Sequence, residues 1–309
     1  MQKISVVINC TPEEISDLGL CLKTLQRFAD EIIIVDMDCG EKLDELKKKY
    51  SLIIYSHPRL AVVEPARNFG ISKATNSWVL LLDPDERLPI SLRKELKQIV
   101  SRSDIDYVKM PRKNIIFGKW LHYTGAWPDY LIRFFKKDVV TWSSKIHVQP
   151  TIEGKGLTLQ DTQRLAIKHY NYRTISDYLQ KAIRYTDKRA TELVKDGYSI
   201  KIADLILKPV QEFNSRFYFQ KGYKDGMAGI IFSALQSFSE VLIYAQVWEK
   251  TKNKKNIVNK TSLVSAIQQA IYEFGHWFTI YLATEYTSNP IKKVLFYMRQ
   301  LINRFVKNW

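Results

Sequence analysis

The feature that most constrains the fold is an uninterrupted apolar run, Trp78–Leu82, that leads directly into the acidic segment DPDE at 83–86. An apolar run without polar alternation is typical of a strand buried on both faces. The proline ends this strand, so the acids are expected at its carboxyl end, where open α/β sheets bind ligands. Two carboxylates one residue apart suit Mg²⁺ or Mn²⁺, which commonly bind phosphate oxygens as well. The segment is equally typical of an acidic helix cap, so two interpretations stay open.

Strand and helix patterns alternate over residues 1 to 110. This alternation predicts an α/β fold, with a mostly parallel sheet that carries helices on both faces. The predicted strands are Ile4–Asn9, Glu31–Asp36, Leu52–Ser56, Trp78–Leu82 and Tyr107–Met110, and the predicted helices are Ile15–Phe28, Leu43–Tyr50, Ala66–Ala74 and Ser91–Val100.

The rest of the chain divides into a turn-rich stretch and a helical stretch. Short strands are predicted at Tyr130–Phe135 and Leu157–Leu159. From residue 176 the apolar period is helical, which predicts Ser176–Asp196, Ile200–Gln220, Gly226–Trp248, Ser262–Ala283 and Pro290–Lys307. With 309 residues, the chain exceeds the usual size of a single core. We expect a sheet domain over 1–170 and a helical, basic region over 171–309.

The positive charge belongs to the second half of the chain. Residues 1 to 162 carry 24 Lys and Arg against 21 Asp and Glu, whereas residues 163 to 309 carry 23 against 11. A basic helical region suits an anionic substrate, an anionic membrane surface or nucleic acid. Nucleic acid is the weakest of these interpretations, because no nucleic-acid-binding motif is recognisable, and we expect no nucleic-acid partner.

Other features bear on the compartment and on membranes. The cysteines Cys10, Cys21 and Cys39 are odd in number and have no metal-ligand spacing, and the chain begins with a strand pattern rather than a signal peptide. Both features favour the cytoplasm. Segment 227–248 contains polar residues and is interpreted as an amphipathic packing helix rather than a membrane span. Segment 290–309 combines basic and large apolar residues, which favours peripheral contact with the inner membrane face.

Several motifs follow one another in a familiar order. The segments SVVIN, DEIIIVD, PARNFGISKA and WVLLLDPDE resemble an inverting glycosyltransferase of family 2 with the GT-A fold. Further along, PRKNIIFGKW, GAWPDYLIRFF, the isolated His147 and HYNY at 169–172 resemble a subgroup that includes enzymes similar to bacterial lipopolysaccharide core β-glucosyltransferases. The resemblance implies a nucleotide-sugar donor, a divalent metal, Mn or Mg, that bridges its phosphates, and a glycan or glycolipid acceptor.

The resemblance also implies roles for single residues. Asn9 and Asp36 would line the nucleobase and ribose pocket, and Arg67 would lie near the donor. Asp83 and Asp85 match the DxD positions, with Asp85 the more direct metal ligand and His147 a later one. Asp129 matches the general base on the acceptor side, and Arg133 and Trp127 would contact the leaving diphosphate and the acceptor. Two other interpretations stay open: His147 would be a structural histidine, and Asp129 would be a turn residue.

The sequence departs from the family pattern at the nucleotide pocket. Where a TRNE-like segment is usual, the chain has CTPEE at 10–14, and where an Asp-Ser-x-Ser-x-Asp pattern is usual, it has DMDCGE at 36–41. These changes predict an active enzyme with an altered donor pocket. Two alternatives stay open: a nucleotidyltransferase, or a non-catalytic nucleotide-sugar-binding scaffold that uses its basic half for assembly. A homo-oligomer is a further partner to consider. No glycine-rich phosphate loop is present, which counts against the nucleotidyltransferase.

Overall fold

The chain folds into two compact units in the computed structural model, which describes residues 2–59, 64–141, 150–251 and 258–296. Unit 1 comprises Met1–Ile115 and Trp127–Asn171, and unit 2 comprises Ile116–Ala126 and Tyr172–Trp309. The short segment 116–126 is therefore contributed to unit 2 from within the sheet region of the sequence.

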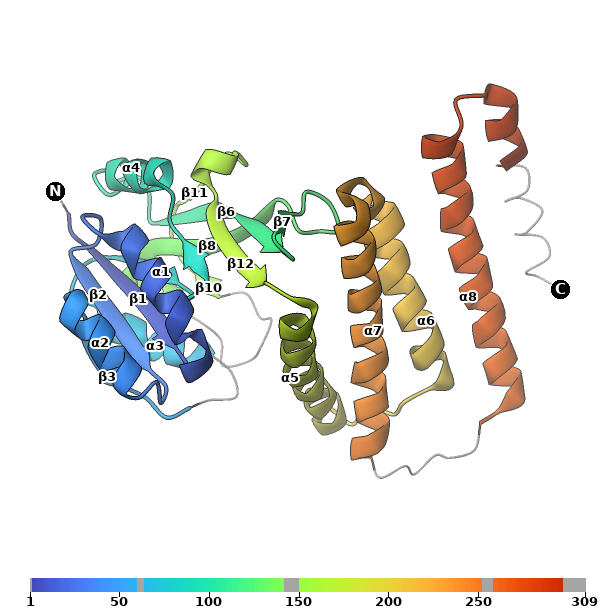
Figure 1. Cartoon of the computed structure of the whole chain (residues 1–309), viewed down its shortest axis with the longest axis horizontal. Coiled ribbons are helices and arrows are strands. Elements are labelled where there is room, and N and C mark those ends of the chain that lie inside the picture. Colours follow the sequence, from blue (N-terminus) through green and yellow to red (C-terminus); the bar gives the residue numbers. More distant parts are fainter. Residues whose placement is uncertain (1, 60–63, 142–149, 252–257, 297–309) are drawn as a thin grey trace. The chain divides into compact units, whose positions relative to one another are not determined.

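Unit 1 follows the predicted order of strands and helices (Figure 1). Its helices are α1 (Ile15–Leu25), α2 (Glu41–Lys49), α3 (Glu64–Lys73) and α4 (Ile90–Ile99). Its strands are β1 (Ile4–Cys10), β2 (Glu31–Asp36), β3 (Ile53–Ser56), β4 (Trp78–Leu82), β5 (Glu86–Arg87), β6 (Tyr107–Ile116), β8 (Asp129–Lys136), β9 (Val140–Thr141), β10 (Thr151–Ile152), β11 (Gly156–Thr158) and β12 (Ile167–Tyr172).

The main sheet runs in the order β3-β2-β1-β4-β8-β6-β12-β5. The pairs β2–β3, β1–β2 and β1–β4 are parallel, whereas β8 is antiparallel to both β4 and β6, and β12 is antiparallel to β5. This mixed, mostly parallel α/β sheet, followed by a helical region, confirms the predicted fold class. The antiparallel strands matter for function, because they carry side chains from late in the sequence to the end of β4.

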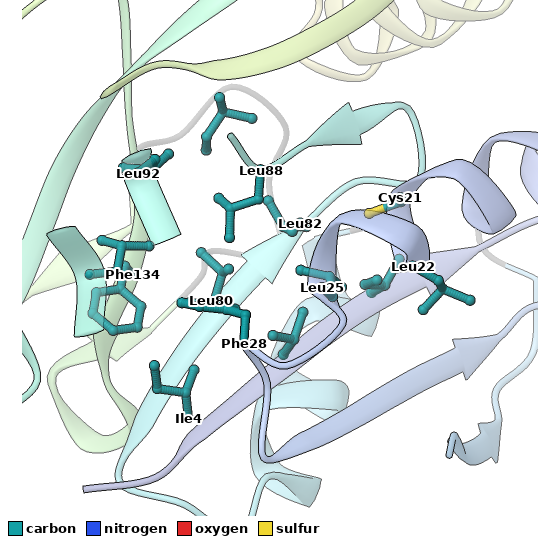
Figure 2. Packing of buried hydrophobic residues seen from close by; sticks show 14 of the residues in the cluster. Ile4, Cys21, Leu22, Leu25, Phe28, Leu80, Leu82, Leu88, Leu92 and Phe134 are labelled. Atoms are coloured by element: carbon teal, nitrogen blue, oxygen red, sulfur yellow. The ribbon is translucent and has the colours of Figure 1, made fainter. Parts of the chain in front are cut away.

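Alternate residues of the central strands enter two different cores. Ile4, Val6 and Ile8 of β1 pack with residues of α1 and α4, whereas Val7 packs with residues of α3. Figure 2 shows part of the first core, where Leu22 and Leu25 of α1 approach Leu80 and Leu82 of β4. A strand that is apolar on both faces needs packing elements on both sides of the sheet. The apolar run 78–82 predicted this burial, and all five residues of β4 are buried.

Helix α3 approaches the sheet closely at Gly70. A Cβ atom at this position would lie 2.5 Å from Cγ1 of Val7 and 2.8 Å from Cγ2 of Val35. Any larger residue would push α3 away from β1 and β2. Arg67 lies one turn earlier on the same helix. The close approach at Gly70 therefore also sets the distance of the Arg67 backbone from the sheet.

Unit 2 is built from long helices. These are α5 (Ile175–Lys195), α6 (Ile202–Phe213), α7 (Gly226–Lys250) and α8 (Lys260–Tyr281), with the short strand β7 (Lys119–Trp120) in the 116–126 segment. Helix α7 packs against α5 and α6, and α8 packs against α6. Asp225 holds the 116–126 segment, since its carboxylate accepts the backbone N–H groups of His122 and Tyr123, each at 2.9 Å. The predicted final helix is helical over residues 290–296, and its remainder lies outside the described residues.

Replacing Gly70 by alanine should destabilise unit 1. We expect Gly70→Ala to lower the free energy of unfolding by about 1–3 kcal/mol, because the added methyl overlaps two buried valines. Gly19 of α1 is the matched control: its added Cβ would meet Leu46 at 3.5 Å, an ordinary contact, so Gly19→Ala should be neutral or stabilising by up to about 1 kcal/mol. Urea unfolding of both variants measures the difference, and equal stability would contradict the close-approach argument.

Candidate active site

Polar residues gather where the neighbouring strands β1, β2 and β4 end. Asn9 is the penultimate residue of β1, Asp36 is the last residue of β2, and Asp83 directly follows β4. Strand β1 pairs in parallel with both β2 and β4, so the three residues share one edge of the sheet. The structure thus brings together residues that lie more than seventy positions apart in the sequence.

The Asp36 carboxylate orders the loop that follows β2. Its Oδ1 accepts the backbone N–H of Cys39 at 2.8 Å, and the Cys39 thiol donates to the Cys10 carbonyl at 3.2 Å. Asp38, between them, has a positive φ of 74°. The loop with the unusual sequence is therefore tied to the end of β1, at the edge where Asn9 lies.

Asp83 lies between two guanidinium groups. Nη2 of Arg67, on α3, is 3.1 Å from Oδ1 of Asp83, and Nη2 of Arg133, on β8, donates to Oδ2. Burial alone would raise the pKa of Asp83, but the charges of Arg133 and Arg67 outweigh it and hold this pKa well below its usual range. Asp83 is consequently a permanent carboxylate that positions two arginines.

Glu86 is the fully buried centre of the same network. Its Oε2 accepts the backbone N–H of Asp83 at 3.0 Å, which closes the tight turn after β4. Its Oε1 is 3.5 Å from Nη2 of Arg133 and 3.5 Å from Nη1 of Arg112. A buried carboxylate with no exposed surface needs such partners, because an unpaired charge in this place would be costly.

Arg133 has donor capacity beyond these ion pairs. Its side chain is 4% exposed, and among the described residues its Nε and Nη1 atoms have no hydrogen-bond partner. Buried guanidinium donors are almost always satisfied, so two nitrogen atoms with unmet N–H groups indicate a binding position for an anion. The arginine lies beside the acidic segment at the carboxyl edge of the sheet.

Asp129 is held by residues of the adjacent strand. The register of β6 and β8 places Arg112 opposite Asp129. Nε and Nη2 of Arg112 lie 2.8 Å and 2.7 Å from Oδ2 of Asp129, and Nδ2 of Asn114 donates to the same oxygen at 2.9 Å. The side chain of Asp129 is 25% exposed, so a fixed carboxylate still reaches solvent.

A chain of side chains connects Asp129 to Asp85. Because Nδ2 of Asn114 donates to Asp129, the Oδ1 of Asn114 accepts from Nδ1 of His169, at 2.6 Å. This leaves Nε2 of His169 facing Oδ2 of Asp85 at 3.4 Å. The His169 nitrogen and the Asp85 oxygen thus face the same position, where a cation could contact both.

The fit to a metal ion rests on this pair. The described residues contain no cluster of three or more His, Cys, Asp or Glu side chains arranged to hold a metal. His147, the histidine that the resemblance suggested, lies outside the described residues. Asp85 and His169 do fit two positions of a divalent ion that takes its other ligands from phosphate oxygens and water. Asp83 is engaged with arginines instead.

Sequence reasoning missed several members of this site: Glu14, Glu86, Arg112, Asn114 and His169. Burial raises the pKa of Glu14, and the nearby Asp85 and Asp83 raise it further, so Glu14 belongs to the acidic edge. A signal existed for Arg112 and Asn114, which are two residues apart in a strand and therefore share one face. His169 begins the HYNY segment that the resemblance includes, but nothing in that segment indicated a metal-ligand role.

Comparisons with known proteins agree with the motifs. Residues 5–152 match the family described as Glycosyl transferase family 2. The chain is 22% identical over 278 residues to an uncharacterized glycosyltransferase of Rickettsia felis, which covers 84% of this chain and 95% of that protein. It is 24% identical over 257 residues to the lipopolysaccharide core biosynthesis glycosyltransferase LpsC of Rhizobium meliloti, with 80% and 92% covered.

Among solved structures, the chain is similar to the mannosyltransferase PcManGT from Pyrobaculum calidifontis in complex with GDP-Man and Mn²⁺. The sequence identity is 12% and the TM-score 0.41, and the match covers 99% of this chain and 87% of that one. The residues that match this family, 5–152, begin in β1 and end in β10, so the matched stretch contains Asp83, Asp85, Asp129 and Arg133.

Asp83→Asn should destabilise the protein in a pH-dependent way. The pKa of Asp83 is lower in the folded protein than in the unfolded chain. Its ion pairs therefore stabilise the fold fully at pH values above the pKa of the unfolded chain, and this stabilisation is lost as the pH falls through the pKa of the folded protein. We expect a loss of about 2 kcal/mol near neutral pH that persists down to about pH 4 and shrinks below it. Urea unfolding at several pH values measures this. Asp138→Asn, an exposed acid of the same unit, is the control, and a pH-independent difference for Asp83→Asn would contradict the prediction.

Proposed function

We propose that this protein, whose residues 5–152 match glycosyltransferase family 2, is an inverting, metal-dependent transferase that moves a sugar from a nucleotide-sugar donor to a cell-surface glycan. The observation that carries the proposal is Arg133. A buried guanidinium with two unsatisfied donor atoms, beside Asp83 and Asp85 at the carboxyl edge of the sheet, suits the diphosphate of such a donor.

The donor would lie across the ends of β1, β2 and β4. Asn9 and Asp36 would contact the nucleobase and the ribose, and their positions at the ends of β1 and β2 support these roles. Arg67 and Arg133 would face the diphosphate, since both extend toward Asp83 from opposite sides. The loop that Asp36 and Cys39 order would set the preference for one base.

Asp85 and His169 would hold the divalent ion. Asn114 fixes the imidazole so that Nε2 faces Asp85, which orients one nitrogen and one carboxylate oxygen toward the same position. A nitrogen ligand favours Mn²⁺ over Mg²⁺ at this position. When bound, the ion would supply Lewis-acid stabilisation of the leaving diphosphate.

Asp129 would be the general base. An acceptor hydroxyl loses its proton to Asp129 as its oxygen bonds to the anomeric carbon, while the bond from that carbon to the diphosphate oxygen breaks. The departing negative charge meets the unmet N–H groups of Arg133. Arg112 and Asn114 both contact Oδ2 of Asp129, which holds the carboxylate in one orientation during the transfer.

The acceptor is proposed to be of the lipopolysaccharide core type, or a related glycolipid. The relative LpsC is named for lipopolysaccharide core biosynthesis and aligns over 80% of this chain, which includes part of the helical unit. The net positive charge of residues 163 to 309 suits a phosphorylated glycan. Transfer would take place on the cytoplasmic side of the membrane.

Asp129→Asn should separate binding from chemistry. We expect turnover to fall about 10²- to 10⁴-fold, because the amide cannot accept the acceptor proton, whereas donor affinity should change little. Release of nucleoside diphosphate from a nucleotide sugar measures turnover, and calorimetric titration measures binding. Asp138→Asn is again the control. Unchanged turnover in Asp129→Asn would remove this residue from the base role.

His169→Gln should weaken metal-dependent nucleotide binding. Titration of the wild type with UDP, GDP, CDP and TDP in Mn²⁺ and then in EDTA should identify one nucleotide that binds only with the metal. For that nucleotide, His169→Gln should lose about tenfold or more in affinity. His122→Gln, in unit 2, should leave the affinity unchanged. Binding that EDTA does not affect would show that the metal part of the mechanism is wrong.

A further inference from the structure

One face of α7 is apolar and uncovered. Four large residues on it, Met227, Ile230, Phe238 and Trp248, are 66%, 40%, 47% and 40% exposed. At 100° per residue they fall within about a third of the helix circumference. The helix has 25 residues, and Met227 and Trp248 lie about 32 Å apart along its axis. Such a long uncovered apolar face on a single helix is unusual for a surface in contact only with water.

The opposite face of α7 packs inside unit 2. Ala228, Phe232 and Val247 are buried, and α5 and α6 both contact the helix. Glu240 lies two residues after Phe238 and therefore almost on the other side of the helix. Burial raises the pKa of Glu240, which agrees with its inward position. The uncovered face is thus free of charged side chains from Gly226 to Trp248.

By length and mean hydropathy, the helical stretch Gly222–Lys250 is apolar enough to cross a membrane, and 22% of its most apolar part is buried. Composition therefore does not exclude a membrane span for segment 227–248, contrary to the interpretation drawn from its polar residues. Its neighbour argues against spanning on other grounds: α5 packs along α7 and exposes charged residues such as Arg184 and Arg189. These charges would enter the hydrocarbon if α7 crossed it.

A groove at the start of α7 adds positive charge to this surface. It has a volume of about 350 Å³ and is lined by Phe117, Lys119, Arg173, Thr174, Ile175, Met227, Ala228 and Ile231, all within unit 2. Among the described residues, no carboxylate lines it. Asp177 lies one turn into α5, where its carboxylate accepts the backbone N–H of Arg173. The groove therefore combines two cations with apolar walls.

We propose that the uncovered face of α7 lies on an anionic lipid bilayer, with a lipid phosphate in the groove between Lys119 and Arg173. The apolar side chains of α7 would enter the boundary between headgroups and acyl chains, and the groove would receive one headgroup with the start of its chain. The charge of the groove is complementary to an anionic headgroup, which favours this occupant over a neutral surface. The proposal does not depend on the transferase reaction.

Vesicle co-sedimentation of the full chain tests the apolar face. With phosphatidylcholine vesicles that contain phosphatidylglycerol, Met227→Asp and Phe238→Asp should each weaken partitioning about tenfold or more. Met227→Asp adds an acid to the first turn of α7, where acids are tolerated, so its fold should persist, and circular dichroism checks both variants. Ile90→Asp, at the exposed start of α4 in unit 1, is the matched control and should bind like the wild type.

The groove is tested by charge. Lys119→Glu should remove the preference for phosphatidylglycerol over pure phosphatidylcholine, Lys119→Arg should keep it, and added salt should reduce the wild-type preference. Loss of transferase activity with lipid binding intact would leave this proposal standing, so the two fail separately.

Three results would overturn the proposal. In the first, wild type, Met227→Asp and Phe238→Asp partition equally, or the wild type does not bind anionic vesicles. In the second, the aspartate variants lower the oligomeric mass in the absence of lipid, which would make the face of α7 an interface between copies. In the third, alkaline carbonate fails to release the bound protein, which would indicate that α7 spans the bilayer.

Discussion

The ion pair between Asp83 and Arg133 is the interaction on which the site depends. It joins Asp83, the residue that follows β4, to a residue of β8, and the Arg133 side chain is almost fully buried. Loss of either partner would leave the other with one ion pair fewer, so that Asp83 would keep its pair with Arg67 and Arg133 its pair with Glu86. Glu86 extends the pair to Arg112, and Arg112 extends it to Asp129. The proposed diphosphate position and the proposed base are therefore parts of one network, and a change at either end is expected to affect the other.

Packing places this network as much as charge does. Gly70 lets α3 lie against β1 and β2, and so brings Arg67 to the oxygen of Asp83 that Arg133 does not use. On the other side, the antiparallel pairing of β8 with β6 places Arg112 beside Asp129. Side chains that start from well-packed elements lose little conformational freedom when they bind, which is how a site keeps its geometry before the substrate arrives.

The sequence predicted the frame of this site better than its interior. The run 78–82 and the acids after it located the edge of the sheet, because a two-sided apolar strand and a proline stop are local signals. Their partners Arg112, Asn114 and His169 come from antiparallel strands that follow β4 in the chain. In these strands the register of pairing, not the apolar period, determines which side chains contact Asp129 and Asp85. The alternation predicted a mostly parallel sheet but did not say which strands run antiparallel, and a purely parallel sheet would not have brought them there. The roles of Asn9, Asp36 and Asp129 stay predictions.

Helix α7 is a second case in which the sequence could not show what surrounds each side chain. Its apolar residues surround most of the helix, so the sequence could indicate packing or membrane contact but could not divide the residues between the two. The structure makes that division, because α5 and α6 cover one side and leave Met227 and Phe238 uncovered on the other. If the uncovered side rests on a bilayer, the half-buried position of Glu240 away from that side also has a reason: a charged side chain on the lipid face would oppose docking, whereas among the helices of unit 2 it avoids the hydrocarbon.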